Sequence, residues 1–323
     1  MRAIRVETYG GPEVLRVHDL EPPQPGPGEV LVDVAASGVN YVDTYQRSGT
    51  YQIPLPFLSG VEGAGTVTAL GDGVTDLEVG DRVGWVAAPG SYAEQVLLPA
   101  DKAIPVPEGV PLDVAAAVLL QGLTAHYLST STYPVQAGDT ALVHAAAGGV
   151  GLLLTQMVGK LRGGRVIANV SSEEKAALAR AAGADEVIRY DQADFAAEVL
   201  RLTADEGVQV VYDGVGRTTF EGSLASLRRR GLLVLYGAAS GPVPPFDPIR
   251  LMAGSFFLTR PTLAHYTATR DELLTRAHAV FDWVAAGRLN VRIGGRYALS
   301  DARKAHEDLQ GRRTTGKLLL VPG

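Results

Sequence analysis

The stretch that decides the fold is Leu142-Val-His-Ala-Ala-Ala-Gly-Gly-Val-Gly-Leu152. It begins with apolar residues typical of a buried strand, continues with a run of alanine and glycine, and ends where an apolar helix pattern starts. Strands and helices go on alternating from this stretch to about Tyr236. Such an alternation predicts a parallel β-sheet with helices on both faces, which is a doubly wound α/β arrangement.

The alternation can be followed element by element. Five strands are expected, at Thr140–Ala145, Arg165–Val170, Glu186–Tyr190, Val208–Tyr212 and Leu232–Tyr236. Four helices are expected between them, at Val150–Leu161, Glu173–Ala182, Asp194–Thr203 and Thr218–Ser226. Gly183 follows the second helix at the position that favours a left-handed cap.

The regions on either side depart from this rhythm. Before Leu112 the chain is rich in short strands separated by glycine and proline, which predicts a barrel-like β domain. Its clearest strands are expected at Glu29–Val39, Val61–Leu70, Asp81–Val86 and Tyr92–Leu98. The tail is expected to form two helices and a last strand, at Arg270–Gly287, Ser300–Leu309 and Lys317–Val321. This pattern alone favours neither closure of the parallel sheet by the tail nor its return to the β domain.

Composition narrows the classes of function. The 323 residues favour about two domains, and a net charge of −6 argues against nucleic acid as a partner, because phosphate binding needs a basic surface. No apolar run reaches the roughly 18 residues of a membrane span. The N-terminus lacks an apolar signal core, so a cytoplasmic protein is expected. There is no cysteine and the six histidines are scattered, so no metal site is expected.

The alanine and glycine run has the chemistry of a dinucleotide-binding loop. Small residues from Ala145 to Gly149 let the backbone approach a pyrophosphate, and Gly151 lets the helix pack closely on the sheet. The N–H groups at the helix start then face the phosphates. Alanine replaces the first glycine of the usual G-x-G-x-x-G pattern, but the loop lies at the first strand-to-helix turn of the predicted sheet, as that motif requires.

The end of the second strand bears on which dinucleotide is bound. An NAD site usually has an acidic residue there for the ribose hydroxyls. This strand ends in Ser171-Ser172 without a carboxylate, and Lys175 is close enough in sequence to meet a 2′-phosphate, which favours NADPH. The alternative is structural: Ser171 and Glu174 fit a capping box, with Lys175 as a solvated helix residue.

No familiar catalytic constellation is present, so hydride chemistry would rest on the cofactor. His144 lies in a predicted buried strand and is interpreted as a hydrogen-bonded core residue. The most suggestive polar cluster is Ser37–Tyr51, which is dense in tyrosine, asparagine and aspartate. It could orient a flat, polar substrate, or it could be a loop held by Asx turns.

Several segments carry a family resemblance: Ser37–Tyr51, Gly60–Val67, Gln121–Ala125, Ala145–Gly151, Tyr212–Gly216 and Leu258–Pro261. In this order they resemble the quinone oxidoreductases of the zeta-crystallin type, within the medium-chain dehydrogenase/reductase superfamily. The resemblance implies a GroES-like β-barrel catalytic domain formed by residues 1–117 and 262–323. It implies a Rossmann NADPH-binding domain at 118–261, with the cofactor in the interdomain cleft. It also implies a homodimer or homotetramer, of which the homodimer is the expectation.

The resemblance also implies site residues. Asn40, Asp43, Tyr45 and Tyr51 match positions that line the family's nicotinamide and substrate pocket, and Gln121 and Thr124 match positions near the nicotinamide. Asn40 and Tyr45 are expected to orient the acceptor oxygen, and Tyr51 to shape the pocket mouth. The pyrophosphate loop is expected at Ala147, Gly148, Gly149, Val150 and Gly151. The 2′-phosphate is expected at Ser171, Lys175, Tyr190 and Arg312, and further cofactor contacts at Val215, Gly237, Ser240, Phe257 and Leu258.

One departure within the superfamily concerns zinc. Zinc alcohol dehydrogenases have Cys where Asn40 stands and His where Val61 stands. The expected activity is therefore zinc-independent reduction of quinones by hydride transfer from NADPH. Two alternatives stay open: NADPH-dependent reduction of 2-alkenals or enoyl compounds, and a non-enzymatic NADPH-binding or RNA-binding crystallin-like protein. The net charge of −6 disfavours RNA binding.

Overall fold

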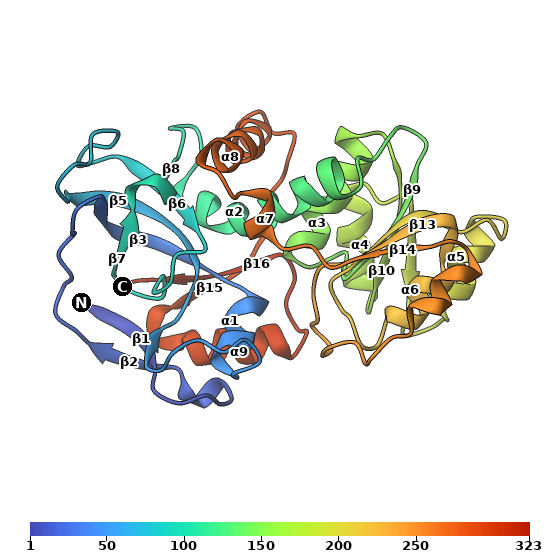
Figure 1. The fold of residues 1–323 in the computed structure, drawn as a ribbon, viewed down its shortest axis with the longest axis horizontal. Helices are drawn as coiled ribbons and strands as arrows, with labels where there is room; N and C mark the ends of the chain where they lie inside the picture. Colours follow the sequence, from blue (N-terminus) through green and yellow to red (C-terminus); the bar gives the residue numbers. More distant parts are fainter. The chain divides into compact units, whose positions relative to one another are not determined.

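The computed structural model describes residues 1–323 and divides them into two compact units. The first unit is Met1–Leu120 with Thr267–Gly323, and the second is Gln121–Tyr266 (Figure 1). No helix has the length and apolar character needed to cross a bilayer.

The second unit contains a six-stranded parallel sheet. Its strands are β9 (Thr140–His144), β10 (Arg165–Val170), β11 (Glu186–Arg189), β12 (Val208–Asp213), β13 (Leu227–Leu235) and β14 (Phe257–Thr259). They lie in the order β11-β10-β9-β12-β13-β14, and every neighbouring pair is parallel. Counted along the chain this order is 3-2-1-4-5-6, that of a Rossmann sheet. The predicted fold class is confirmed, and β14 is a strand that the sequence pattern did not reveal.

Helices connect these strands. They are α3 (Gly149–Gln156), α4 (Glu173–Ala182), α5 (Phe195–Leu202) and α6 (Phe220–Ala225), with a π turn at Met157–Leu161 and a 3-10 turn at Pro248–Ala253. A π turn at Leu128–Thr132 precedes the first strand, and α7 (Leu263–Tyr266) follows the last. The helix α2 (Leu112–Tyr127) spans the boundary between the units. Apolar side chains of β9 to β13, α5 and α6 form the core of the unit.

The first unit is built on two antiparallel systems of strands. A seven-stranded sheet holds β15 (Ile293–Ala298), β16 (Lys317–Val321), β3 (Glu29–Val39), β5 (Glu62–Leu70), β6 (Arg82–Val86) and β8 (Ile104–Pro105), with β7 (Gln95–Pro99) beside β3. A smaller sheet holds β2 (Arg16–Asp19), β1 (Arg2–Val6) and β4 (Phe57–Leu58). Within the larger sheet only β15 and β16 are parallel.

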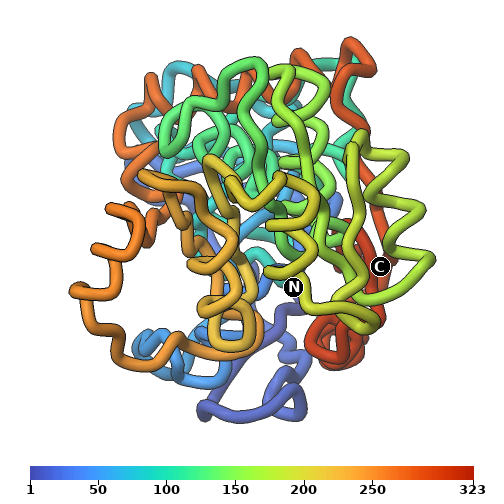
Figure 2. Tube along the Cα trace, turned by 90° about the vertical axis from the view of Figure 1, so that its right-hand side faces the viewer, coloured from blue at the N-terminus to red at the C-terminus, as the bar shows by residue number.

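The tail of the chain belongs to this first unit. Strand β16 pairs with β3, with Leu318 opposite Val39. The guanidinium of Arg2 donates to the carbonyl of Gly323 at 3.1 Å, so the termini lie side by side (Figures 1 and 2). The helices of this unit are α1 (Tyr41–Arg47), α8 (Arg270–Ala285) and α9 (Ala302–Gln310), with 3-10 turns at Pro12–Val14, Ala100–Lys102 and Leu299–Asp301.

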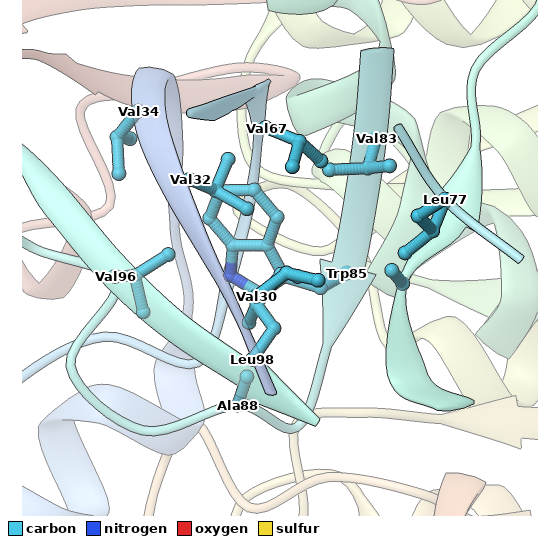
Figure 3. Packing of buried hydrophobic residues seen from close by; sticks show 11 residues of the cluster. Val30, Val32, Val34, Val67, Leu77, Val83, Trp85, Ala88, Val96 and Leu98 are labelled. Carbon is cyan, nitrogen blue, oxygen red and sulfur yellow. The ribbon is translucent and has the colours of Figure 1, made fainter. Parts of the chain in front are cut away.

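The core of the larger sheet surrounds one tryptophan. The indole of Trp85 is fully buried among valine side chains of β3, β5 and β7 (Figure 3). Its N–H donates to the hydroxyl of Ser91 at 2.8 Å, so its one polar atom is satisfied. A second cluster, with Val39, Leu318 and Ala302, packs β3, β16 and α9 together. The strand β3, which leads into Asn40, thus contributes apolar side chains to both clusters.

Candidate functional site

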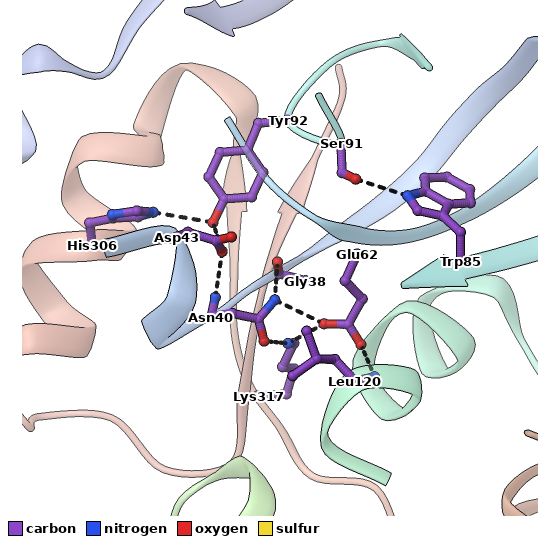
Figure 4. Close-up of polar contacts among 10 residues, drawn as sticks. All are labelled: Gly38, Asn40, Asp43, Glu62, Trp85, Ser91, Tyr92, Leu120, His306 and Lys317. Carbon is purple, nitrogen blue, oxygen red and sulfur yellow. Dashed lines mark hydrogen bonds and ion pairs between the residues drawn. The ribbon is translucent and has the colours of Figure 1, made fainter. Parts of the chain in front are cut away.

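The start of α1 is built around one buried carboxylate, Asp43. Its Oδ2 atom accepts the backbone N–H of Asn40 at 2.8 Å and the hydroxyl of Tyr92 at 2.7 Å (Figure 4). Asn40 caps the helix and Asp43 is its third residue, a spacing at which an acidic side chain closes back on the backbone at the helix start. Asp43 is fully buried, so it holds the helix in place from inside the unit.

The hydrogen bonds that lead from Arg47 through His306 and Tyr92 to Asp43 all donate toward Asp43. The Arg47 guanidinium can only donate, so His306 Nδ1, at 3.2 Å, must accept. The ring proton of His306 is therefore assigned to Nε2, which donates to the Tyr92 oxygen at 3.1 Å and leaves the Tyr92 hydroxyl to donate to Asp43. Burial and the nearby Arg47 charge lower the pKa of His306 to about 3, so the ring stays neutral at physiological pH.

The ionised form of Asp43 is disfavoured in this buried position. Burial raises the pKa of its carboxyl to about 7, although the hydrogen bonds from Tyr92 and Asn40 act in the opposite direction. The same burial, together with the charge of Asp43, raises the pKa of Tyr92 well above its ordinary value. The Oδ1 atom of Asp43 has no hydrogen-bond partner, so a proton held there would leave both bonds to Oδ2 intact.

The side chain of Asn40 is held by three groups. Its Nδ2 atom donates to the carbonyl of Gly38 at 3.0 Å and to Glu62 Oε2 at 3.1 Å. Its Oδ1 atom accepts from Lys317 Nζ at 2.7 Å (Figure 4). Both amide hydrogens are therefore engaged inside the protein, and a direct bond from Asn40 to an acceptor oxygen would require one of them to be released.

Tyr45 and Tyr51 occupy the outer part of the predicted substrate cluster. Their rings meet edge to face with centroids 5.3 Å apart, and the N–H of Tyr51 donates to the carbonyl of Tyr45 at 3.0 Å. Tyr45 is partly buried on α1, and Tyr51 is 46% exposed in the segment that follows. These two tyrosines are therefore more accessible than Asn40 and Asp43, which are both buried.

Gln121 and Thr124 lie in α2. They are three residues apart and so share one face of the helix. Both are buried. Their predicted position near the nicotinamide stays a prediction.

The glycine-rich loop has the close packing that its sequence implies. Gly148 caps α3 in an extended conformation, and the helix starts at Gly149. A Cβ atom on Gly151 would lie 2.3 Å from the carbonyl oxygen of Ala145 and 2.7 Å from the Cα of Ala146, so only glycine fits there. Ala145 itself has a φ of 49°, which turns the chain sharply from β9 toward the helix. The first N–H groups of α3 have no partner within the helix, and their binding of the pyrophosphate stays a prediction.

The end of β10 shows how the predicted 2′-phosphate residues lie. Lys175 Nζ donates to Ser171 Oγ at 3.2 Å, so the ammonium group folds back over the strand end. The N-terminal cap of α4 is Ser172, whose Oγ accepts the Lys175 N–H at 3.3 Å. The alternative capping box of Ser171 and Glu174 was therefore wrong, because the cap is Ser172 and the third residue of the helix is Lys175.

The remaining 2′-phosphate candidates lie in different units. The Tyr190 N–H donates to the carbonyl of Val170 at 3.1 Å, which places this half-exposed tyrosine at the same sheet edge as Ser171. Arg312 belongs to the first unit and follows α9, exposed and with a φ of 56°.

The end of β12 is organised by Asp213, which the sequence analysis missed. Its Oδ1 atom accepts the N–H groups of Val215 at 2.8 Å and Gly216 at 3.0 Å, and so fixes the turn that carries Val215. The hydroxyl of Ser240 donates to the carbonyl of Val215 at 2.8 Å. A Cβ on Gly237 would lie 2.4 Å from the carbonyl oxygen of Gly214, so these predicted cofactor residues share one close-packed edge.

His144 is a hydrogen-bonded core residue, as interpreted from the sequence. Asn169 Nδ2 donates to its Nδ1 atom at 3.0 Å, which leaves the proton on Nε2 to donate to Ser223 Oγ at 3.0 Å. The Ser223 hydroxyl donates in turn to Asp213 Oδ2 at 2.8 Å. These side chains link β10, β9 and β12 at their carboxyl ends, where a Rossmann sheet binds its ligand.

The last predicted cofactor contacts lie on the edge strand. Phe257 and Leu258 belong to β14, and Phe257 is 59% exposed. No group of three or more His, Cys, Asp or Glu side chains in the structure could hold a metal ion.

Comparison with known proteins adds to this geometry. Residues 26–108 match the alcohol dehydrogenase GroES-like domain, and residues 182–320 match the zinc-binding dehydrogenase family. A quinone oxidoreductase of Pseudomonas aeruginosa is 46% identical over 324 residues, with 99% of each chain covered. A 2-haloacrylate reductase of a Burkholderia species is 41% identical over 330 residues, with 98% of each chain covered.

Solved structures agree with the sequence relatives. A mycobacterial protein in complex with NADPH is 54% identical, with 100% of both chains covered and a TM-score of 0.97. The fold and the sequence similarity define a medium-chain dehydrogenase/reductase. Within that superfamily the chain belongs to the quinone oxidoreductase family, which confirms the resemblance seen in its motifs.

Proposed function

We propose that this chain is an NADPH-dependent oxidoreductase that reduces quinones. The observation that carries the proposal is the full-length similarity to a quinone oxidoreductase, together with an intact glycine-rich loop. A strand end with Ser171 and Lys175, and without a carboxylate, fits the 2′-phosphate that distinguishes NADPH from NADH. When bound, NADPH supplies a hydride from C4 of its nicotinamide.

The chain's own residues would bind and orient the two reactants. The loop from Ala147 to Gly151 would hold the pyrophosphate, with Val215, Gly237 and Ser240 along the neighbouring strand ends. The phenol of Tyr45 would donate a hydrogen bond to the acceptor oxygen, which becomes an anion as the hydride arrives. Tyr51 would cover the flat face or edge of the acceptor. Uptake of one proton by the reduced oxygen completes the hydroquinone.

A steady-state panel tests this function. Purified protein is assayed with NADPH and a series of benzoquinones and naphthoquinones, with NADH as the alternative reductant. We expect turnover of several quinones with a clear preference for NADPH. No quinone turnover above the uncatalysed rate would overturn the proposal.

The 2′-phosphate site has its own test. Lys175→Ala and the double variant Lys175→Ala/Arg312→Ala should raise the KM for NADPH by about tenfold or more, since a charge-assisted hydrogen bond is worth about 1.5–3 kcal/mol. The KM for NADH should stay within a factor of two. Lys160→Ala removes an exposed lysine of the same unit and serves as the matched control. An unchanged preference for NADPH in the double variant would show that the phosphate is held elsewhere.

A second activity is favoured by one relative. The 2-haloacrylate reductase reduces, by its name, an activated alkene rather than a quinone. The same hydride donor and the same two tyrosines would suit an alkene that carries an electron-withdrawing carbonyl group. Adding 2-haloacrylate and 2-alkenals to the panel separates the two, because the better acceptor will show the higher kcat/KM.

The assembly is proposed to be a homodimer formed through the edge of the Rossmann sheet. Strand β14 is the last strand of that sheet and has a partner on one side only. Exposed apolar side chains gather on it and on the turn before it, namely Ile249 (63% exposed), Met252 (77%) and Phe257 (59%). An exposed edge with such side chains is suited to pairing with a second copy. A cytoplasmic location stays a prediction, which fractionation of the source cells would test.

A further inference from the structure

A buried ion pair lies beside Asn40 and was not expected from the sequence. Lys317 Nζ lies 2.5 Å from Glu62 Oε2, and the two side chains are 2% and 0% exposed (Figure 4). They come from the first residues of β16 and β5. Leu318 pairs with Val39 across the sheet, and this register brings Lys317 next to Asn40. The pair therefore joins three strands at the point where α1 begins.

The surroundings are shaped to hold this pair. Glu62 Oε1 accepts the backbone N–H of Leu120 at 2.6 Å. Glu62 Oε2 accepts hydrogen bonds from Asn40 Nδ2 and from Lys317 Nζ. A Cβ on Gly38 would lie 2.2 Å from Glu62 Oε2 and 2.7 Å from Lys317 Nζ, so glycine is needed to leave room for both charges. Only five lysines occur in the chain, and this one is withdrawn from water.

Stability alone is a weak explanation for this arrangement. Taking two charges out of water costs as much as their attraction returns, and a well-packed apolar pair is often as stable. The two charges do, however, fix the orientation of the Asn40 carboxamide. The ammonium group fixes the oxygen end of the Asn40 carboxamide, and the carboxylate fixes its nitrogen end, so the amide cannot rotate.

We propose that Glu62 and Lys317 are positioning residues, which clamp the Asn40 carboxamide and thereby the first turn of α1, so that Tyr45 meets the acceptor in a fixed orientation. The proposal rests on the proposed quinone reductase function for its kinetic part. Its structural part, the clamp on Asn40, stands on the hydrogen bonds alone.

The clamp can be observed without any assay of activity. The chain has three asparagines, Asn40, Asn169 and Asn290, so asparagine labelled with ¹⁵N in the side-chain amide yields three pairs of amide signals. The Asn40 pair is assigned by its loss in Asn40→Asp. We expect its hydrogen exchange in Lys317→Met to be at least about tenfold faster than in the wild type, because the partner of the amide oxygen is gone. The other two pairs should keep their exchange rates.

Two further variants separate positioning from stability. Glu62→Gln/Lys317→Met removes both charges, so it should regain most of the Tm lost in Lys317→Met while the Asn40 exchange stays fast. Gly38→Ala keeps both charges but inserts a methyl group between them, and it should also release Asn40. Lys304→Met is the matched control, because Lys304 is exposed and pairs with Asp308 on the surface.

Kinetics supply the second readout. In Lys317→Met and in the double variant, kcat/KM for the quinone should fall about tenfold, equivalent to about 1.4 kcal/mol, while the KM for NADPH stays within a factor of two. Lys304→Met should match the wild type. Unchanged Asn40 exchange in all three clamp variants would overturn the proposal, and so would faster exchange with an unchanged kcat/KM. A wild-type protein without quinone turnover would instead refute the proposed function and leave the exchange data to decide the clamp.

Discussion

At the scale of single residues, Asp43 shows how burial changes the chemistry of a carboxyl group. Its Oδ2 atom is well satisfied, yet desolvation is the larger effect and raises its pKa from 3.8 to about 7. A folded-state pKa above the unfolded value means that the folded protein favours the protonated form. The stabilisation from that form is fully present below pH 4 and is lost as the pH rises through 7.

This shift predicts a pH-dependent effect of Asp43→Asn. Asparagine can still accept from the Asn40 N–H and the Tyr92 hydroxyl, but it carries no charge to desolvate. The free energy of unfolding of the variant, relative to the wild type, should rise between pH 4 and 7 by at most about 1.4 kcal/mol per pH unit and level off above that range. Urea unfolding at pH 5, 6, 7 and 8 measures it.

The control for this prediction is Asp271→Asn. Asp271 is exposed on α8, so its replacement should leave the pH dependence of the wild type unchanged. A constant difference between Asp43→Asn and the wild type over the whole range would show that Asp43 is ionised throughout.

Residue types were visible in the sequence, but their partners were not. Asn40, Asp43 and Tyr45 fall within one polar segment, so their proximity could be predicted. Glu62 and Lys317 are 255 residues apart, and only the pairing of β16 with β3 brings them together. Neither residue stands in a recognisable motif with the other, so no spacing rule could have found the ion pair.

At the scale of elements, segments with a clear period or clear end signals were predicted closely, and segments without them were missed. Strands β3, β10 and β16 and helix α4 have the predicted bounds, because each has a clear period or clear end signals. Helix α1 has seven residues, too few for a helical period to stand out in a polar segment. Strand β15 contains two adjacent glycines, a residue type that is rare in strands. Its residues alternate in burial but not in polarity, so the sequence did not predict a strand there.

The loop before α3 supports a prediction about two neighbouring glycines. Gly151→Ala places a methyl group against the backbone of Ala145 and should displace α3, at a cost of about 1–3 kcal/mol typical of overpacking. It should therefore lower both the Tm and the affinity for NADPH. In Gly148→Ala the new Cβ would meet one atom, the Ala145 oxygen, at 3.1 Å. This variant should keep most of its Tm and lose affinity for NADPH, because its methyl group would stand on the part of the loop that we propose to hold the phosphates.

Thermal unfolding and NADPH fluorescence titration measure the two effects separately. Gly109→Ala is the matched control, since a Cβ at Gly109 meets nothing within 4 Å. Equal losses of Tm in Gly148→Ala and Gly151→Ala would contradict the distinction between a packing glycine and a binding glycine.

At the scale of the whole molecule, the two units differ in how the edge strands of their sheets are protected from pairing with another chain. The first unit ends its large sheet with β15, which has six residues and includes two glycines, and with β8, which has only two residues. The Rossmann sheet ends with β11 on one side and β14 on the other. Strand β11 carries Glu186 and Arg189 in surface ion pairs, which discourage pairing with another chain, whereas β14 carries exposed Phe257.

This asymmetry predicts where a second copy binds. Met252→Lys places a charge in the exposed apolar group that also contains Ile249 and Phe257, and a charge buried at the centre of an interface without a partner is strongly unfavourable. The variant should sediment as a monomer, or dissociate at concentrations at which the wild type is a dimer, and keep the wild-type far-ultraviolet circular dichroism. Val79→Lys is the control, because Val79 is 65% exposed but lies in the first unit, in the segment between β5 and β6. Sedimentation velocity over a hundredfold range of concentration decides it: a dimer that survives Met252→Lys, or one that is lost equally in Val79→Lys, would exclude the β14 edge as the interface.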